Sequence, residues 1–145
     1  MSGIVVGVDG SPNSGRALSW ALSEAAKVHA PLTVLAVSEA MRSFWTGNPD
    51  PLALDSDKLD KTRAAAEELT QKVASGLGDA RPTSVNVHVV YGFPAKELVD
   101  ASQGADLVVV GSRGGGGFSR LMLGSVSSQV VEHAACPVVV VPHEK

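Results

Sequence analysis

The strongest constraint on the fold is the spacing of short, valine-rich segments along the chain. Continuous apolar runs occupy residues 4–8, 32–37, 107–110 and 137–141. Runs of this length without polar alternation are typical of strands buried on both faces of a sheet. Residues 85–90 alternate valine with polar side chains over most of their length. This alternation predicts a fifth strand in a more exposed, edge-like position.

Between these strands the apolar residues recur at three- and four-residue spacing, which predicts amphipathic helices. Such stretches cover residues 17–28, 57–77, 94–101 and 126–134. The order βαβαβαβαβ requires right-handed crossovers between parallel strands. We therefore expect an α/β fold, a doubly wound five-stranded parallel sheet with helices on both faces. A length of 145 residues suits a single domain, predicted to span residues 1–145.

Residues 38–56 show neither the alternation of a strand nor the three- and four-residue spacing of a helix. They contain Phe44 and Trp45 in a stretch broken by prolines. A loop of this length is uncommon in a compact domain unless it has a role. We expect the two aromatic side chains either to fold over a ligand or to pack at a subunit contact.

Composition narrows the classes of function. The formal net charge is −3 and the pI is about 5.7, so the chain lacks the positive field of a nucleic-acid binder. The apolar runs are too short to span a bilayer, and the first residues lack a basic stretch followed by a long apolar one. Cys136 is the single cysteine and reads as a buried small hydrophobe. We expect a cytoplasmic protein with no membrane or nucleic-acid partner.

Two predicted strands end in turns rich in glycine. The first is followed by Asp9, Gly10 and Ser11, and the fourth by residues 111–117, which include four consecutive glycines. In open parallel sheets, ligands bind at the carboxyl ends of the strands where the winding reverses. Glycines let several backbone N–H groups approach one anion, and residues 124–128 lead into a helix whose first N–H groups also favour an anion. The segment between Leu107 and Val131 contains two arginines and no acidic residue. These features predict a phosphate-binding site, although the glycines are also compatible with a surface loop without a ligand.

Several other nucleotide and hydrolase motifs are absent from the sequence. It contains no G-x-x-x-x-G-K-[ST], no G-x-G-x-x-G after the first strand and no G-x-S-x-G. The sequence therefore argues against a P-loop hydrolase, a dinucleotide-binding domain and an α/β-hydrolase.

The spacing Gly111-x2-Gly114-x9-Gly124-Ser125 resembles the ATP-binding signature of the universal stress protein family. Residues 5–11, 105–114, 123–127 and 136–140 extend the similarity over the whole chain. The resemblance implies a sheet of order 3-2-1-4-5 and a site for ATP with Mg²⁺. Asp9 and Val37 would hold the adenosine, and Gly7 and Ser11 would line the mouth of the site. The implied residues around the phosphates are Gly111, Arg113, Gly114, Gly124, Ser125, Val126 and Ser127.

Each implied role has a simpler alternative, because Asp9 can cap a turn, Arg113 can be a solvated charge and Ser125 can cap a helix. Our first hypothesis is an ATP-binding stress-response or regulatory protein with slow or no hydrolysis, since the implied site holds no evident general base. A weak Mg²⁺-dependent ATPase or phosphotransferase is the alternative. Binding of cyclic AMP, or action as a dimer without any nucleotide, also stays open.

The last predicted strand carries four consecutive valines, Val138, Val139, Val140 and Val141. In the implied sheet order this strand lies at an edge and leaves one row of backbone groups unpaired. An apolar edge is prone to aggregation unless it is covered. We therefore predict a homodimer in which this strand pairs with its copy about a two-fold axis.

Overall fold

The computed structural model describes residues 3–9, 12–39, 56–79, 81–112 and 124–142. Strands and helices alternate along the chain as predicted. The elements are β1 (Ile4–Val8), α1 (Pro12–Lys27), β2 (Leu32–Glu39), α3 (Ser56–Ser75), β3 (Val85–Gly92), α4 (Pro94–Ser102), β4 (Leu107–Gly111), α5 (Ser125–His133) and β5 (Val138–Val141). The turn after β1 is shorter than predicted because α1 already begins at Pro12, and proline suits the first helical position.

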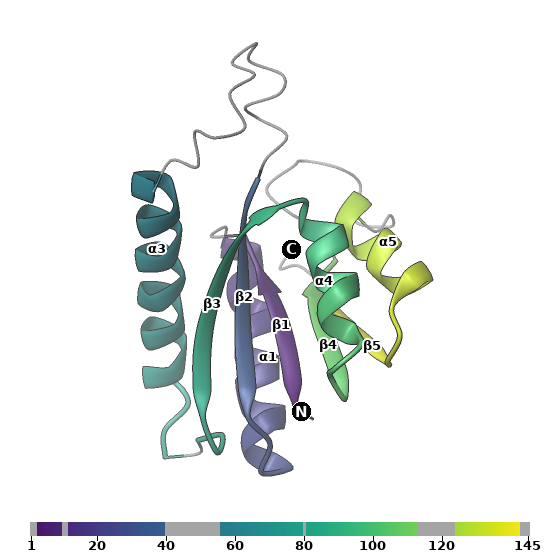
Figure 1. Ribbon diagram of the computed structural model, residues 1–145. Helices are drawn as coiled ribbons and strands as arrows, with labels where there is room; N and C mark the ends of the chain where they lie inside the picture. The colour runs from purple at the N-terminus through teal and green to yellow at the C-terminus, as the bar shows by residue number, and fades with distance from the viewer. Residues whose placement is uncertain (1–2, 10–11, 40–55, 80, 113–123, 143–145) are drawn as a thin grey trace.

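The strands form one parallel sheet of order β3-β2-β1-β4-β5, which confirms the fold class and the implied strand order. Figure 1 shows α1 behind the sheet and α4 and α5 in front of it, while α3 flanks β3 and β2. The chain winds outward from β1 through β2 to β3, then crosses back to β4 and continues to β5. The winding direction therefore reverses between β1 and β4.

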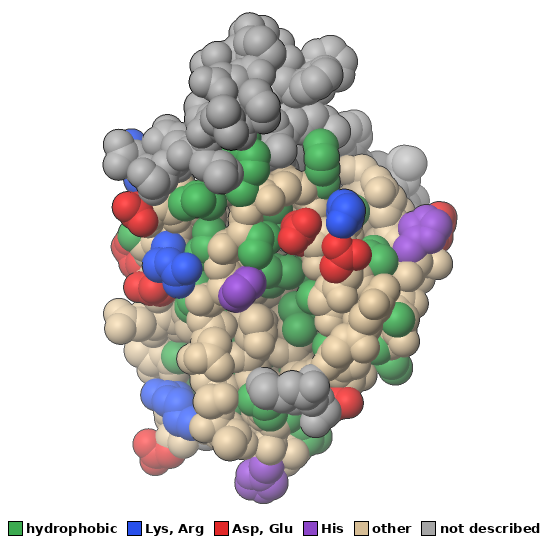
Figure 2. All heavy atoms as spheres, viewed as in Figure 1, with side chains coloured by type: hydrophobic (Ala, Val, Ile, Leu, Met, Phe, Trp, Pro, Cys, Tyr) green, Lys and Arg blue, Asp and Glu red, His purple; other side chains and the backbone are tan. Residues whose placement is uncertain are grey.

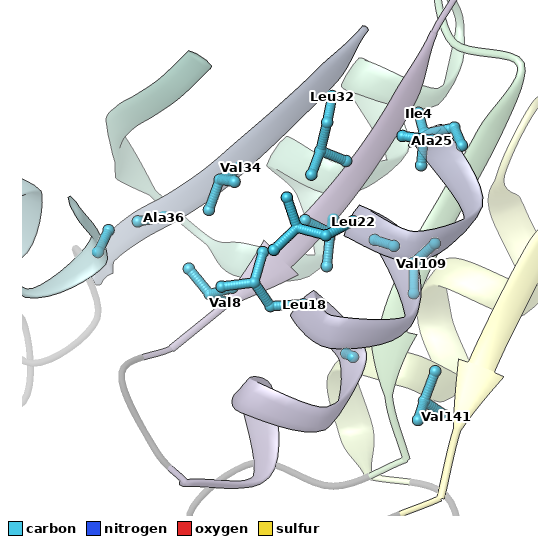
Figure 3. Packing of buried hydrophobic residues seen from close by; sticks show 14 residues of the cluster. Ile4, Val8, Leu18, Leu22, Ala25, Leu32, Val34, Ala36, Val109 and Val141 are labelled. Carbon is cyan, nitrogen blue, oxygen red and sulfur yellow. The ribbon is translucent and has the colours of Figure 1, made fainter. Parts of the chain in front are cut away.

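The two faces of the sheet carry separate apolar clusters. On one face, Val6 and Val109 pack with Leu18 and Leu22 of α1, and Figure 3 shows these helix side chains pointing at the strands. On the other face, Val5, Leu35, Val108 and Val110 pack with Leu98 of α4 and Val130 of α5. Successive residues of a strand point to opposite faces, so β1, β2 and β4 need apolar side chains at nearly every position. This requirement explains the unbroken valine runs.

The predicted exposed strand, β3, lies at an edge of the sheet, as expected from its alternating sequence. The N–H of Leu32 donates to the carbonyl of Ser84 at 2.8 Å, so carbonyl groups of even-numbered residues there face β2. Those of odd-numbered residues face the open edge, because backbone groups alternate along a parallel strand. Arg63 of α3 reaches this edge and donates from Nη1 to the Val87 carbonyl at 3.2 Å. An exposed arginine thus occupies a backbone acceptor in the middle of the edge.

The remaining sequence expectations concern the two aromatic residues, Cys136, membrane spans and surface charge. Phe44 and Trp45 lie outside the described residues, so their predicted roles stay predictions. Cys136 is half-buried and packs against the apolar cluster on the α4 and α5 face of the sheet, and burial raises the pKa of its thiol. None of the described helices is both long and apolar enough to cross a membrane. On the face seen in Figure 2, basic and acidic side chains of the described residues are interspersed.

Candidate functional site

The two central strands part at their carboxyl ends. Pairing between β1 and β4 stops at Val6 and Val109, although the strands continue to Val8 and Gly111. On their outer sides both strands stay paired to their last residues. We call the unpaired ends, residues 7–8 and 110–111, the strand split. It lies where the winding reverses, which is the place where open parallel sheets bind ligands.

Four of the residues predicted for the site lie at or beside the strand split. Gly7 is in β1 within the split, and Gly111 is the last residue of β4. Asp9 follows β1 directly and is exposed to solvent, while Val37 is half-buried in the neighbouring strand β2. The register pairs Val8 with Ala36, so Asp9 and Val37 are each the next residue along two adjacent strands. The fold therefore brings together residues that are far apart in the sequence.

Gly7 also has a packing role that its sequence context does not reveal. A Cβ atom added at this position would lie 2.9 Å from Cδ1 of Leu98 and 3.0 Å from its Cδ2. Leu98 belongs to α4 and is buried in the second apolar cluster. The missing side chain thus allows α4 to lie directly on β1 at the start of the split.

The start of α5 is held at the end of β4 by three residues, Ser112, Gly124 and Ser127, which we call the serine clasp. The Gly124 N–H donates to the Ser112 carbonyl at 2.6 Å. The buried Ser127 hydroxyl lies 3.1 Å from the same carbonyl and 3.1 Å from the Gly124 carbonyl. Ser112 is itself fixed to β5, because its N–H donates to the Val141 carbonyl at 2.8 Å. The clasp therefore attaches α5 to the carboxyl edge of the sheet.

The first turn of α5 presents backbone donors beside the split. Gly124 is the N-cap and has an extended backbone, with no side-chain cap bond to the helix. The first helical bond is donated by Ser128 to Gly124, so the N–H groups of Ser125, Val126 and Ser127 precede it. No acidic residue lies in this turn. These donors and the helix dipole together favour an anion at this end of the site.

The side chains in this turn differ in their exposure. Ser125 is exposed, Val126 is half-buried and contacts the second apolar cluster, and Ser127 is buried. Ser11, Arg113 and Gly114, which the sequence also assigned to the site, lie outside the described residues. Sequence reasoning missed the parts played by Ser112 and Leu98. Ser112 stands within the glycine signature, whereas nothing in the sequence signals the contact of Leu98 with Gly7.

Metal ligands are sparse in the part of the chain that the structure covers. No group of three or more histidine, cysteine, aspartate or glutamate side chains there could hold a metal ion. Magnesium commonly binds through one or two carboxylates together with substrate phosphates and waters. A magnesium ion carried on phosphates is therefore compatible with this site.

These features define a class of protein: a doubly wound α/β domain with a helix start that presents backbone N–H donors at its switch point. Comparison with known proteins identifies the group within that class. The model of the universal stress protein family matches residues 1–142, and the chain belongs to this family. The resemblance carried by the glycine signature is thereby confirmed.

Known relatives agree with this assignment. Universal stress protein Rv2005c of Mycobacterium tuberculosis is 37% identical over 139 residues, which cover 96% of this chain and 47% of the relative. The chain thus spans about half the length of the curated relatives it matches. Among solved structures, the universal stress protein UspA from Lactobacillus plantarum has a TM-score of 0.77 at 28% identity, with 97% of each chain covered. A universal stress protein in complex with cAMP has a TM-score of 0.75 at 25% identity, with 99% and 98% covered.

Proposed function

We propose that this protein binds ATP at the strand split and acts as a stress-response regulator with slow or no hydrolysis. The observation that carries the proposal is the parting of β1 and β4 at the point where the serine clasp holds the start of α5. Parted strand ends accept a ligand, and the first turn of α5 supplies donors for its charged end. A nucleotide matches this division because it is polar at one end and anionic at the other.

Asp9 and Val37 hold the adenosine in this proposal. Both are at the carboxyl ends of neighbouring strands, and the Asp9 carboxylate can accept hydrogen bonds from sugar or base donors. The structural relative in complex with cAMP contains an adenine nucleotide, which supports the same class of ligand here.

The phosphates lie toward the start of α5 in this proposal. Gly111, Gly124, Ser125 and Val126 come from the described residues around this end, and Arg113 and Gly114 belong to the same signature. Mg²⁺ reaches the site on the phosphates, where it would neutralise charge on their oxygens. Asp9 is the only carboxylate among the proposed site residues, and at the adenosine end it is remote from a terminal phosphate. We therefore expect slow or absent hydrolysis.

Calorimetry with ATP and Mg²⁺ tests this function, with Gly114→Asp as the disruptive variant. The new side chain brings bulk and negative charge to the glycine signature, so we expect binding to be lost. Gly104→Asp is the matched control, because Gly104 follows α4 and a Cβ there meets no atom within 4 Å. Equal ATP affinity in Gly114→Asp and the unmodified protein would contradict the assignment.

Measurements of phosphate release and of nucleotide binding on the unmodified protein distinguish the alternative functions. Rapid release of inorganic phosphate from bound ATP would favour an ATPase or phosphotransferase. Tighter binding of cyclic AMP than of ATP would favour a cyclic-nucleotide protein. Binding of neither would favour an interaction protein that works without nucleotide.

We also propose that the protein forms a homodimer along β5, which lies at the second edge of the sheet. The Pro137 carbonyl accepts from the Val108 N–H of β4, and the Val141 carbonyl accepts from the N–H of Ser112, which follows β4. The backbone groups of Val138 and Val140 therefore face away from β4. Pairing with the same strand of a second copy would satisfy those groups. Val140→Lys should give a monomer or an insoluble chain by light scattering. Val85→Lys, at the other edge, should leave the dimer unchanged, and a monomeric unmodified protein would refute the proposal.

A further inference from the structure

The Ser127 hydroxyl is directed at the protein backbone. The residue is 2% exposed, and its hydroxyl lies 3.1 Å from both the Ser112 and the Gly124 carbonyl oxygens. A serine hydroxyl has a single proton, so the two carbonyls share it. No proton is then left for a phosphate oxygen. The family resemblance, by contrast, places Ser127 among the residues around the phosphates.

Ser127 takes part in the serine clasp through the hydrogen bonds of its side chain. The bond from Gly124 to Ser112 joins two backbone groups, as does the bond from Ser112 to Val141. Residues of many kinds could make these backbone bonds. The hydroxyl of Ser127 adds a contact that crosses 15 positions of the sequence and fixes the first turn of α5 to the end of β4.

The clasp also joins the two ends of the glycine segment. Ser112 is the last described residue before that segment, and Gly124 is the first one after it. A ligand that contacts both strand β4 and the first turn of α5 depends on the relative position of these two ends. Binding groups that are already in position cost less entropy to order when the ligand arrives.

We propose that Ser127 is a positioning residue, which sets the first-turn N–H groups of α5 at the strand split without contacting the ligand through its hydroxyl. This inference rests on the proposed nucleotide function and refines the role of one residue in it. Loss of the hydroxyl should weaken binding of the phosphates. Binding of the adenosine should not change, because β1 and β2 position Asp9 and Val37.

Isothermal calorimetry with ATP and with adenosine separates these two ends of the ligand. We expect Ser127→Ala to bind ATP about three- to tenfold more weakly, the range that corresponds to one lost hydrogen bond. Adenosine affinity should not change. Ser127→Thr keeps a hydroxyl and should recover most of the ATP affinity. Ser128→Ala, the same chemical change one residue further along α5, should bind ATP as the unmodified protein does.

Hydrogen exchange in the nucleotide-free protein gives a second readout. The Gly124 N–H is bonded within the clasp, and the Ser128 N–H makes the first bond of α5. Both should exchange faster in Ser127→Ala, since the hydroxyl that holds this turn is gone. If Ser127→Ala does not fold, Ser127→Cys keeps a similar size with a weaker donor and allows the same comparison.

The outcomes distinguish this inference from the function on which it rests. An unmodified protein that binds no nucleotide overturns the proposed function. If the unmodified protein binds ATP and Ser127→Ala binds it equally well, the positioning role alone is wrong. Equal losses for ATP and adenosine would also overturn it, because they would indicate general damage to the fold.

Discussion

Replacing Gly7 by alanine should destabilise the protein through one identifiable contact. The added Cβ would lie 2.9 Å from Leu98 Cδ1, whereas carbon atoms pack best at about 3.5–4.0 Å. Leu98 is 3% exposed and cannot turn its side chain into solvent. Either the Leu98 side chain must repack within the core, or α4 and β1 must move apart by roughly 0.5–1 Å, to restore a normal separation.

The size of the effect follows from two opposing contributions. Overpacking a well-filled core costs about 1–3 kcal/mol. Replacing glycine by alanine also restricts the unfolded chain, which returns roughly 0.4–1 kcal/mol when the native backbone tolerates a side chain. Gly7 is not among the described glycines with positive φ, so backbone strain adds nothing. We expect a net loss of about 1–2 kcal/mol, or a Tm lower by roughly 3–8 °C for a domain of this size.

Urea unfolding of a set of matched variants measures this loss. Gly104→Ala is the control, because a Cβ there meets no atom within 4 Å, and it should be neutral or slightly stabilising. Leu98→Ala alone should cost about 2–5 kcal/mol through the cavity it leaves. The double variant should cost less than the sum, since the new Cβ then has room. Strict additivity, or an unchanged Gly7→Ala protein, would refute the contact as the cause.

Three further experiments test other parts of the fold. Arg63→Ala uncovers the Val87 carbonyl at the β3 edge, so light scattering should detect more association than in the unmodified protein. Burial raises the pKa of Cys136, so a thiol reagent should label it more slowly in the folded chain than in urea near the ordinary thiol pKa of 9.0. Ser102→Ala removes the acceptor of the Ala135 N–H at 2.8 Å and should cost about 1–3 kcal/mol in urea unfolding.

Each of these experiments has its own control or contradicting outcome. Lys61 is also exposed on α3, and Lys61→Ala should leave the association state unchanged. Equal association of the Lys61→Ala and Arg63→Ala variants would show that Arg63 does not protect the β3 edge. The raised pKa of Cys136 means that the fold favours the neutral thiol. Stability linked to this group is present below the unfolded pKa and is lost as pH rises through the folded one, so stability that grows in that range would contradict the sign. An unchanged unfolding curve for Ser102→Ala would show that water replaces the lost bond.

The sequence predicts the architecture well because its main signals are local. Uninterrupted valine runs report burial on two faces, and the alternation in β3 reports its place at an edge. The contacts that shape the site are not local in this sense. Leu98 meets Gly7 across the packing of α4 on β1, and Ser127 meets Ser112 after a separation of 15 residues. Periodicity and turn chemistry give no information about such partners, so these roles came only from the structure.

The residues proposed for the nucleotide site differ in what they contribute to the fold. Gly7 makes room for α4, Gly124 starts α5, and Ser127 secures that start to β4, so all three shape the site. Asp9 and Ser125 are exposed beside the same split, and in the proposed function their side chains face the ligand. Substitutions in the first group should therefore change stability or geometry together with binding, whereas substitution of the exposed Ser125 should change ATP binding while the unfolding free energy stays nearly constant.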